Sequence, residues 1–227
     1  MEPAVPAGNG ESQALSETVS QSLDPCLIIE GAPHERWTLR ATWQYSTMSQ
    51  QPHLPPGVVP EPAGNGRVSV WTFPRPPVVV PDPRQVIVTL GQLEICRTSS
   101  SVKVLETSHP PTWYLPMDAF VAGSLRPTSG SSVCEYKGVA SYFDLIASGA
   151  DDIQTPAVFA ERAAWGYARP LPGYELLAGR VALYPGQVDS VTVDGERVRP
   201  QPGGFYGGWI THDVAGPFKG APGTSYW

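Results

Sequence analysis

Segment 106–145 of this chain carries an unusual concentration of side chains that can do chemistry. It combines an acid, a base, a thiol, phenols and an ammonium group in a stretch that is also rich in Pro and Gly. These side chains are Glu106, His109, Tyr114, Cys134, Tyr136, Lys137 and Tyr142. Scaffold sequence rarely concentrates such groups, so the segment predicts a ligand-binding or catalytic site.

Three residues of the segment are candidates for catalysis. Lys137 can hold a carboxylate or phosphate, or act as a base if desolvation lowers its pKa. Glu106 follows the apolar run VKVL and can orient Lys137 or serve as a general base. Cys134 becomes a nucleophile if a neighbouring base or cation lowers its pKa. The alternatives are structural: a solvated or ion-paired Lys, a carboxylate that caps backbone N–H groups, and a buried thiol.

Six further residues are candidates for ligand contacts. They are Tyr114, Tyr142, Tyr136, Thr107, His109 and Arg126. Tyr rings supply flat apolar walls with one polar tip, although core packing explains them equally well. Pro110 and Pro111 hold His109 in an extended backbone, where it is either a ligand contact or a simple loop residue. Arg126 precedes the stretch 129–132, whose backbone N–H groups form either an anion nest or a plain loop.

Composition and charge narrow the functional classes. The net charge is −6 and no Lys/Arg cluster of nucleic-acid type occurs, so we expect neither nucleic acid nor an anionic membrane as partner. The three Cys form no CxxC and no paired Cys/His spacing, which argues against structural zinc and a disulfide framework. We expect no metal and no cofactor. No apolar run has transmembrane length and no secretory signal is found, so we expect a cytoplasmic protein with reduced thiols.

The 26 Pro and 23 Gly residues disfavour long helices and predict a mainly β fold of compact antiparallel sheets. Residues 84–99 predict a hairpin, VKVL predicts a third strand, and a strand is expected on each side of Gly138. A second hairpin is expected around Asp194–Gly195. Only MDAFVAGSL and LPGYELLAG favour helical turns.

Three regions are expected along the chain. Residues 1–22 are polar and unpatterned, which indicates disorder. Residues 23–67 read as a Pro-rich, partly ordered extension. Residues 68–227 form one β-rich domain. Its Gly- and aromatic-rich tail, 202–227, is expected to wrap the domain and bury its rings singly.

Several pieces of the chain resemble a family catalogued as domain of unknown function number 427, which is also labelled nucleotidyltransferase-like. The pieces are VLETSHPPTWYLP, CEYKGVASYF, AAWGYARPLP and VALYPGQVD, and the similarity runs from about residue 68 to 227. The resemblance implies a small β-rich fold of the type called a β-tent, and it places Lys137 in a CxxKG family motif. It implies no settled activity.

The nucleotidyltransferase label has little support in the residues. Such enzymes follow a Gly-Ser pair with two Asp one residue apart, which hold metal ions. Here Gly130–Ser131 is followed by Asp144 alone, and the adjacent Asp151 and Asp152 would face opposite ways on a strand.

We therefore expect one compact pocket around Lys137, Tyr114, Tyr142, Glu106 and Cys134 that binds, or binds and turns over, a small anionic metabolite. Two alternatives remain. One is a non-enzymatic interaction module, in which the aromatic tail and the Pro-rich segments meet another protein. The other is nucleotide chemistry, as the family label suggests.

Overall fold

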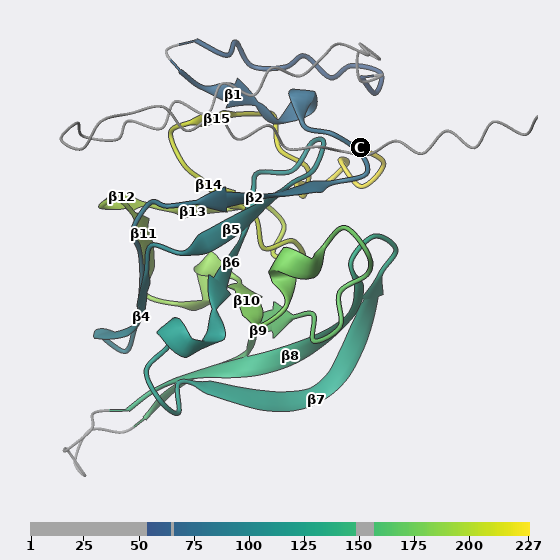
Figure 1. Cartoon of the computed structure of the whole chain (residues 1–227). Coiled ribbons are helices and arrows are strands. Elements are labelled where there is room, and N and C mark those ends of the chain that lie inside the picture. The colour runs from purple at the N-terminus through teal and green to yellow at the C-terminus, as the bar shows by residue number, and fades with distance from the viewer. Residues whose placement is uncertain (1–53, 65, 149–156) are drawn as a thin grey trace, which may run out of the picture. The chain divides into compact units, whose positions relative to one another are not determined.

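A computed structural model describes residues 54–64, 66–148 and 157–227 (Figure 1). The expected disordered segment 1–22 and most of the Pro-rich extension 23–67 lie outside the described residues. The described part is mainly β, which confirms the predicted fold class. Within it, no helix is long and apolar enough to cross a membrane.

Two antiparallel sheets dominate the structure. One has seven strands in the order β2-β5-β6-β10-β9-β8-β7, and the other has four in the order β12-β11-β3-β4. Two further sheets are the two-stranded pairs β1–β15 and β13–β14. The strands are β1 (Val68–Ser69), β2 (Val78–Asp82), β3 (Val86–Leu90), β4 (Leu93–Thr98), β5 (Ser101–Leu105), β6 (Thr112–Pro116), β7 (Leu125–Cys134), β8 (Gly138–Ala147), β9 (Val158–Gly166), β10 (Arg180–Leu183), β11 (Ser190–Val193), β12 (Glu196–Arg197), β13 (Arg199–Pro200), β14 (Trp209–Ile210) and β15 (Val214–Ala215). Four short 3₁₀ turns are η1 (Val70–Thr72), η2 (Met117–Ala119), η3 (Glu175–Leu177) and η4 (Pro185–Gln187).

The predicted hairpins are confirmed. Strands β3 and β4 are joined at Gly91–Gln92, and β11 and β12 at Asp194–Gly195. All four turn residues have positive φ, as a two-residue hairpin turn requires. Strands also flank Gly138, since β7 and β8 form a long hairpin whose turn contains Lys137. The expected third strand is β5, which pairs with β2 and β6 in the seven-stranded sheet and not with β4.

The main core lies between the two large sheets. Apolar side chains of β3, β4 and β11 pack there against those of β6, β8, β9 and β10. Trp113 of β6 and Trp209 of β14 are fully buried in this core, and their rings stack 5.5 Å apart at 13°. Trp227 likewise contacts Trp71 at 5.4 Å. Trp209 is buried and Trp227 is half-buried, and each meets an aromatic partner on the domain where the sequence predicted single rings.

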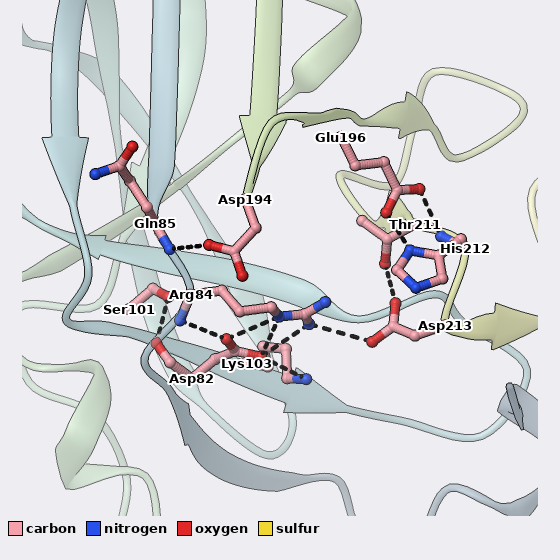
Figure 2. A network of polar contacts seen from close by, with 10 residues as sticks. All are labelled: Asp82, Arg84, Gln85, Ser101, Lys103, Asp194, Glu196, Thr211, His212 and Asp213. Atoms are coloured by element: carbon pink, nitrogen blue, oxygen red, sulfur yellow. Dashed lines mark hydrogen bonds and ion pairs between the residues drawn. The ribbon is translucent and has the colours of Figure 1, made fainter. Parts of the chain in front are cut away.

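A polar network, whose residues are drawn in Figure 2, lies over the ring of Trp113. Asp82, at the end of β2, accepts hydrogen bonds from Arg84 Nε (3.0 Å) and Nη2 (2.9 Å) and pairs with Lys103 Nζ (2.8 Å). Arg84 also pairs with Asp213 of the tail at 3.2 Å. Both cations lie over the Trp113 ring, at 5.0 and 5.4 Å from its centre. The network therefore joins β2, β5 and the tail above one buried ring.

These partners keep the Asp82 carboxylate ionised. Burial raises the pKa of Asp82, but the hydrogen bonds from Arg84 and Lys103 outweigh burial, and the net pKa is lowered. The ionised carboxylate therefore contributes stability above the unfolded-state pKa of 3.8, and this contribution is lost as the pH falls through the lower folded-state value.

We predict that Asp82→Asn lowers the free energy of unfolding by about 2 kcal/mol at pH 7, because it leaves two half-buried cations short of a partner. Urea denaturation measures this. Glu94→Gln is the matched control, since Glu94 pairs with Arg97 at the exposed surface and its loss should cost less than about 1 kcal/mol. The difference in the free energy of unfolding between Asp82→Asn and the unmodified protein should shrink below about pH 4, where Asp82 becomes protonated. Equal losses in the two variants would contradict this account.

Candidate functional site

Glu106 is the centre of a second charged cluster, formed by three separate segments. It lies just after β5, and its Oε1 accepts a hydrogen bond from Arg75 Nη2 at 3.3 Å. Its Oε2 is 3.9 Å from Nζ of Lys137, which comes from the turn between β7 and β8. Lys137 is only 9% exposed. The structure thus brings together the two residues that the sequence placed at the heart of the site.

Local backbone geometry positions Lys137. Its carbonyl accepts a hydrogen bond from Leu171 N at 3.2 Å. The next residue, Gly138, has φ of 97°, which L side chains rarely adopt, and a Cβ there would touch Leu171 and the carbonyl of Arg169. The positive φ therefore favours glycine after Lys137, while the contacts with segment 169–171 are at ordinary van der Waals distance.

The turn between Glu106 and His109 has an uncommon backbone. Ser108 has φ of 70°, in the left-handed region that non-glycine residues rarely occupy. Its N–H donates to Val70 O (3.1 Å) and its carbonyl accepts from Lys219 N (2.9 Å). Its buried hydroxyl has no hydrogen-bond partner among the described residues. Strained backbone and unpaired buried polar groups both concentrate at functional sites.

His109 is buried and held in one tautomer by Gln201. The Gln201 Oε1 accepts from Gly208 N (3.0 Å), and its Nε2 donates to Lys219 O (2.8 Å), so the amide orientation is determined by two backbone groups. The same Nε2 lies 3.0 Å from His109 Nδ1. Because this nitrogen can only donate, Nδ1 accepts, and the proton of the neutral ring is on its Nε2.

Electrostatics keep His109 neutral. Burial, followed by the positive charges of Lys219, Arg75 and Lys137, lowers the pKa of His109 to about 3. Burial and then the charge of Arg75 also lower the pKa of Lys219. The positive charges of Arg75, Lys137 and Lys219 therefore all act on His109, and Glu106 contacts Arg75 and Lys137.

The C-terminal tail supplies the part of the site that segment 106–145 lacks. Lys219 Nζ donates to the main-chain oxygen of Trp227 (2.5 Å) and lies 5.7 Å from the centre of the Tyr206 ring. Tyr206 also packs edge-on against His109, with ring centres 4.6 Å apart. The tail folds back on itself so closely that a Cβ at Gly203 would lie 1.9 Å from Gly220 O.

Sequence reasoning missed four residues of this cluster as members of the site. They are Arg75, Gln201, Tyr206 and Lys219, which lie 31 to 74 residues from segment 106–145 along the chain. No local pattern marks them. The Gly-rich composition of the tail was the one available sign that the tail packs closely against other segments, because glycines allow backbone segments to approach each other closely.

Two predicted site residues lie in a second core cluster. Tyr114 of β6 is 1% exposed and packs near Trp165 and Tyr167, with ring centres 6.4 and 6.3 Å away. Burial raises the pKa of Tyr114 well above its ordinary value. Cys134, at the end of β7, is half-buried and packs against the same cluster. Tyr114 is therefore a buried member of this second core cluster.

The remaining predicted residues are spread over the β7–β8 hairpin and the turn after β5. Tyr136 is half-buried beside Lys137 and packs against the second core cluster. The Thr107 hydroxyl donates to Phe73 O at 2.5 Å. The Tyr142 hydroxyl is 2.8 Å from Ser132 Oγ, on the hairpin itself.

Arg126 lies far along the same hairpin. It pairs with Asp144 at 2.8 Å. Arg126 is eight residues from Cys134 on β7, which corresponds to about 26 Å at the usual rise of a strand. The structure therefore does not bring Arg126 to Glu106.

A hollow of about 370 Å³ lies elsewhere, lined by Arg84, Val193, Asp194, Glu196 and His212. It contains none of the predicted site residues. His212 pairs with Glu196, and that hydrogen bond raises the pKa of His212. Within residues 54–64, 66–148 and 157–227, no group of three or more His, Cys, Asp or Glu side chains is placed to hold a metal ion.

Comparison with protein-family models gives a match. A family model described as a domain of unknown function, DUF427, covers residues 78–194, which is more than half of the chain. The matched span runs from β2 to the end of β11 and includes Glu106, His109 and Lys137. Arg75 and Lys219 lie outside it. No curated protein matches the chain.

The two described histidines should titrate differently. We predict that His109 stays neutral, with its proton on Nε2, from pH 8 to pH 5, because its pKa is about 3. Its neutral ring contributes stability above the ordinary value of 6.5, and this is lost as the pH falls toward 3. His212 should titrate above 6.5 and return to its ordinary pKa in Glu196→Gln. Nitrogen-detected NMR of the imidazoles, assigned with His109→Gln, measures both, and a His109 signal that titrates near 6.5 would refute the assignment.

Proposed function

The chain belongs to the DUF427 family, a domain of unknown function, and we propose that it binds a small anionic metabolite at the cluster around Glu106. One observation carries this proposal. The cationic side chains of Arg75 and Lys137 meet there at the one carboxylate of Glu106, and together with Lys219 they lower the pKa of His109.

Excess positive charge in a partly buried place is unfavourable unless something compensates it. Burial is the main cause of the lowered pKa values of His109 and Lys219, and neighbouring positive charges lower both further. An anion would relieve it, since Lys and Arg form their strongest hydrogen bonds with carboxylate and phosphate oxygens. The chain as a whole carries a charge of −6, so the cationic region is a local feature.

The neutral His109 fits the same role. Its Nε2–H is a hydrogen-bond donor that carries no charge, and it has no partner among the described residues. A ring with a pKa of about 3 does not supply a proton at neutral pH, so His109 would orient a ligand and would not act as general acid. If the bound ligand is turned over, Lys137 and Glu106 are the groups available for acid–base work.

The experiment is a thermal-shift screen of the purified protein against carboxylates and phosphates, repeated on Lys137→Met, which keeps the apolar stem and removes the charge. An anion at 100 times its Kd should add about 2.7 kcal/mol. The melting temperature should then rise by at least about 5 °C. Lys137→Met should weaken that anion at least about tenfold, which is 1.4 kcal/mol.

Arg126→Gln is the matched control, because it removes a positive charge that lies away from Glu106. It should leave the shift unchanged. If no anion stabilises the protein, or if Lys137→Met responds as the unmodified protein does, anion binding at this cluster is refuted. The search then turns to protein partners of the aromatic tail.

A further inference from the structure

The chain contains three lysines, and Lys137 is the one without a close partner. Lys103 Nζ pairs with Asp82 at 2.8 Å, and Lys219 Nζ donates to a main-chain oxygen at 2.5 Å. The side chain of Lys137 is only 11% exposed, yet its Nζ is 3.9 Å from Glu106 Oε2, which is beyond hydrogen-bond distance. Within the described residues, the Lys137 amine therefore makes no hydrogen bond.

A buried amine without a hydrogen bond calls for an explanation. Such a group costs free energy, and unpaired buried polar groups mark catalytic roles or ligands. Lysine amines attack carbonyl carbons and form Schiff bases with them. Lys103 and Lys219 would each have to give up a close partner to do this. Lys137 would not, so it is the lysine best placed to act as a nucleophile.

A short series of hydrogen bonds joins the turn of Lys137 to the segment of Arg75. Leu171 N donates to Lys137 O (3.2 Å), and Tyr174 N donates to Leu171 O (3.0 Å). The buried Tyr174 hydroxyl then donates to Pro77 O (2.8 Å), two residues after Arg75. The backbone around the amine and the backbone around the guanidinium are therefore held together by segment 171–174.

Arg75 and Lys137 are placed to hold two groups of one small molecule. Each lies against a different oxygen of the Glu106 carboxylate, Arg75 Nη2 at 3.3 Å and Lys137 Nζ at 3.9 Å. In the part of the chain that the structure describes, Nη2 is the one nitrogen of the Arg75 side chain that has a hydrogen bond. The other donors of this guanidinium remain for a ligand, and carboxylates are their preferred acceptors. A carbonyl group of the same ligand would then be within reach of Nζ.

We propose that Lys137 forms a Schiff base with a small oxo acid whose carboxylate is held by Arg75. This inference rests on the proposed function and adds the class of ligand. In the step, Nζ forms a bond to the carbonyl carbon, and the carbonyl oxygen leaves as water with two protons of the Lys137 ammonium. The third proton stays on the imine nitrogen, whose positive charge faces Glu106 as the ammonium charge did.

The test is trapping with sodium borohydride, which reduces an imine to a stable secondary amine. The protein is incubated with pyruvate, or with levulinate, whose ketone is farther from its carboxylate. It is then reduced, and the modified lysine is located by peptide mass spectrometry. At least one of the two probes should modify Lys137, at least about tenfold more than Lys103 or Lys219. The more reactive probe gives the spacing of carboxylate and ketone that the site accepts.

Three controls separate the amine from its charge. Lactate has the carboxylate of pyruvate but no ketone, so it should bind and leave no adduct. Lys137→Arg keeps the cation and removes the attacking amine, so it should lose the adduct and still bind lactate within about threefold of the unmodified protein. Lys103→Arg is the matched control variant and should keep the adduct at Lys137.

The outcomes distinguish this inference from the proposed function. If no carboxylate or phosphate raises the melting temperature, the proposed function fails. If anions bind in a Lys137-dependent way but neither probe modifies Lys137, only the Schiff base is overturned. Modification spread evenly over the three lysines would also overturn it, because an unspecific reaction needs no site.

Discussion

The stack of Trp113 on Trp209 is the contact on which the rest of the molecule depends. Trp113 belongs to β6, an inner strand of the seven-stranded sheet, and Trp209 belongs to the C-terminal tail. Two hydrogen bonds to backbone carbonyls support the stack. The backbone N–H of Trp209 donates to Pro111 O (2.8 Å), and its side-chain Nε1 donates to Leu183 O (3.2 Å). A buried aromatic pair of this size contributes strongly to stability. Because Trp209 is fixed in the core, the residues on both sides of it along the chain are held at defined positions.

These flanking residues reach two different charged clusters. Asp213, four residues after Trp209, reaches Arg84 in the network above Trp113 (Figure 2). Lys219 reaches the cluster around Glu106. The network above Trp113 is balanced, since Arg84 and Lys103 meet two carboxylates. In the cluster around Glu106, Arg75 and Lys137 share one contacting carboxylate. This contrast explains why we assign the first a structural role and the second a ligand.

Much of the fold follows from local sequence patterns. The positive-φ turns at Gly91–Gln92 and Asp194–Gly195 are set by residues that tolerate that backbone, so both hairpins were predictable. Lys137 and Glu106 were also predictable as a pair, because both lie at the ends of strands that the sequence pattern predicts. Tyr114 was harder to place. Its ring suits either a core or a binding surface, and only the pairing of β6 in the middle of the sheet decides that it is buried.

The sequence by itself determined the antiparallel β class, the hairpins and the concentration of reactive side chains in segment 106–145, because these depend on residues close together in the chain. Only the tertiary structure decided the charge and the partners of the site. Arg75, Gln201 and Lys219 come to His109 through long-range backbone contacts, such as that of Ser108 O with Lys219 N. Such contacts depend on how the tail packs, and no local pattern encodes them. The tautomer of His109 and the positive excess around Glu106 therefore exist only in the folded chain.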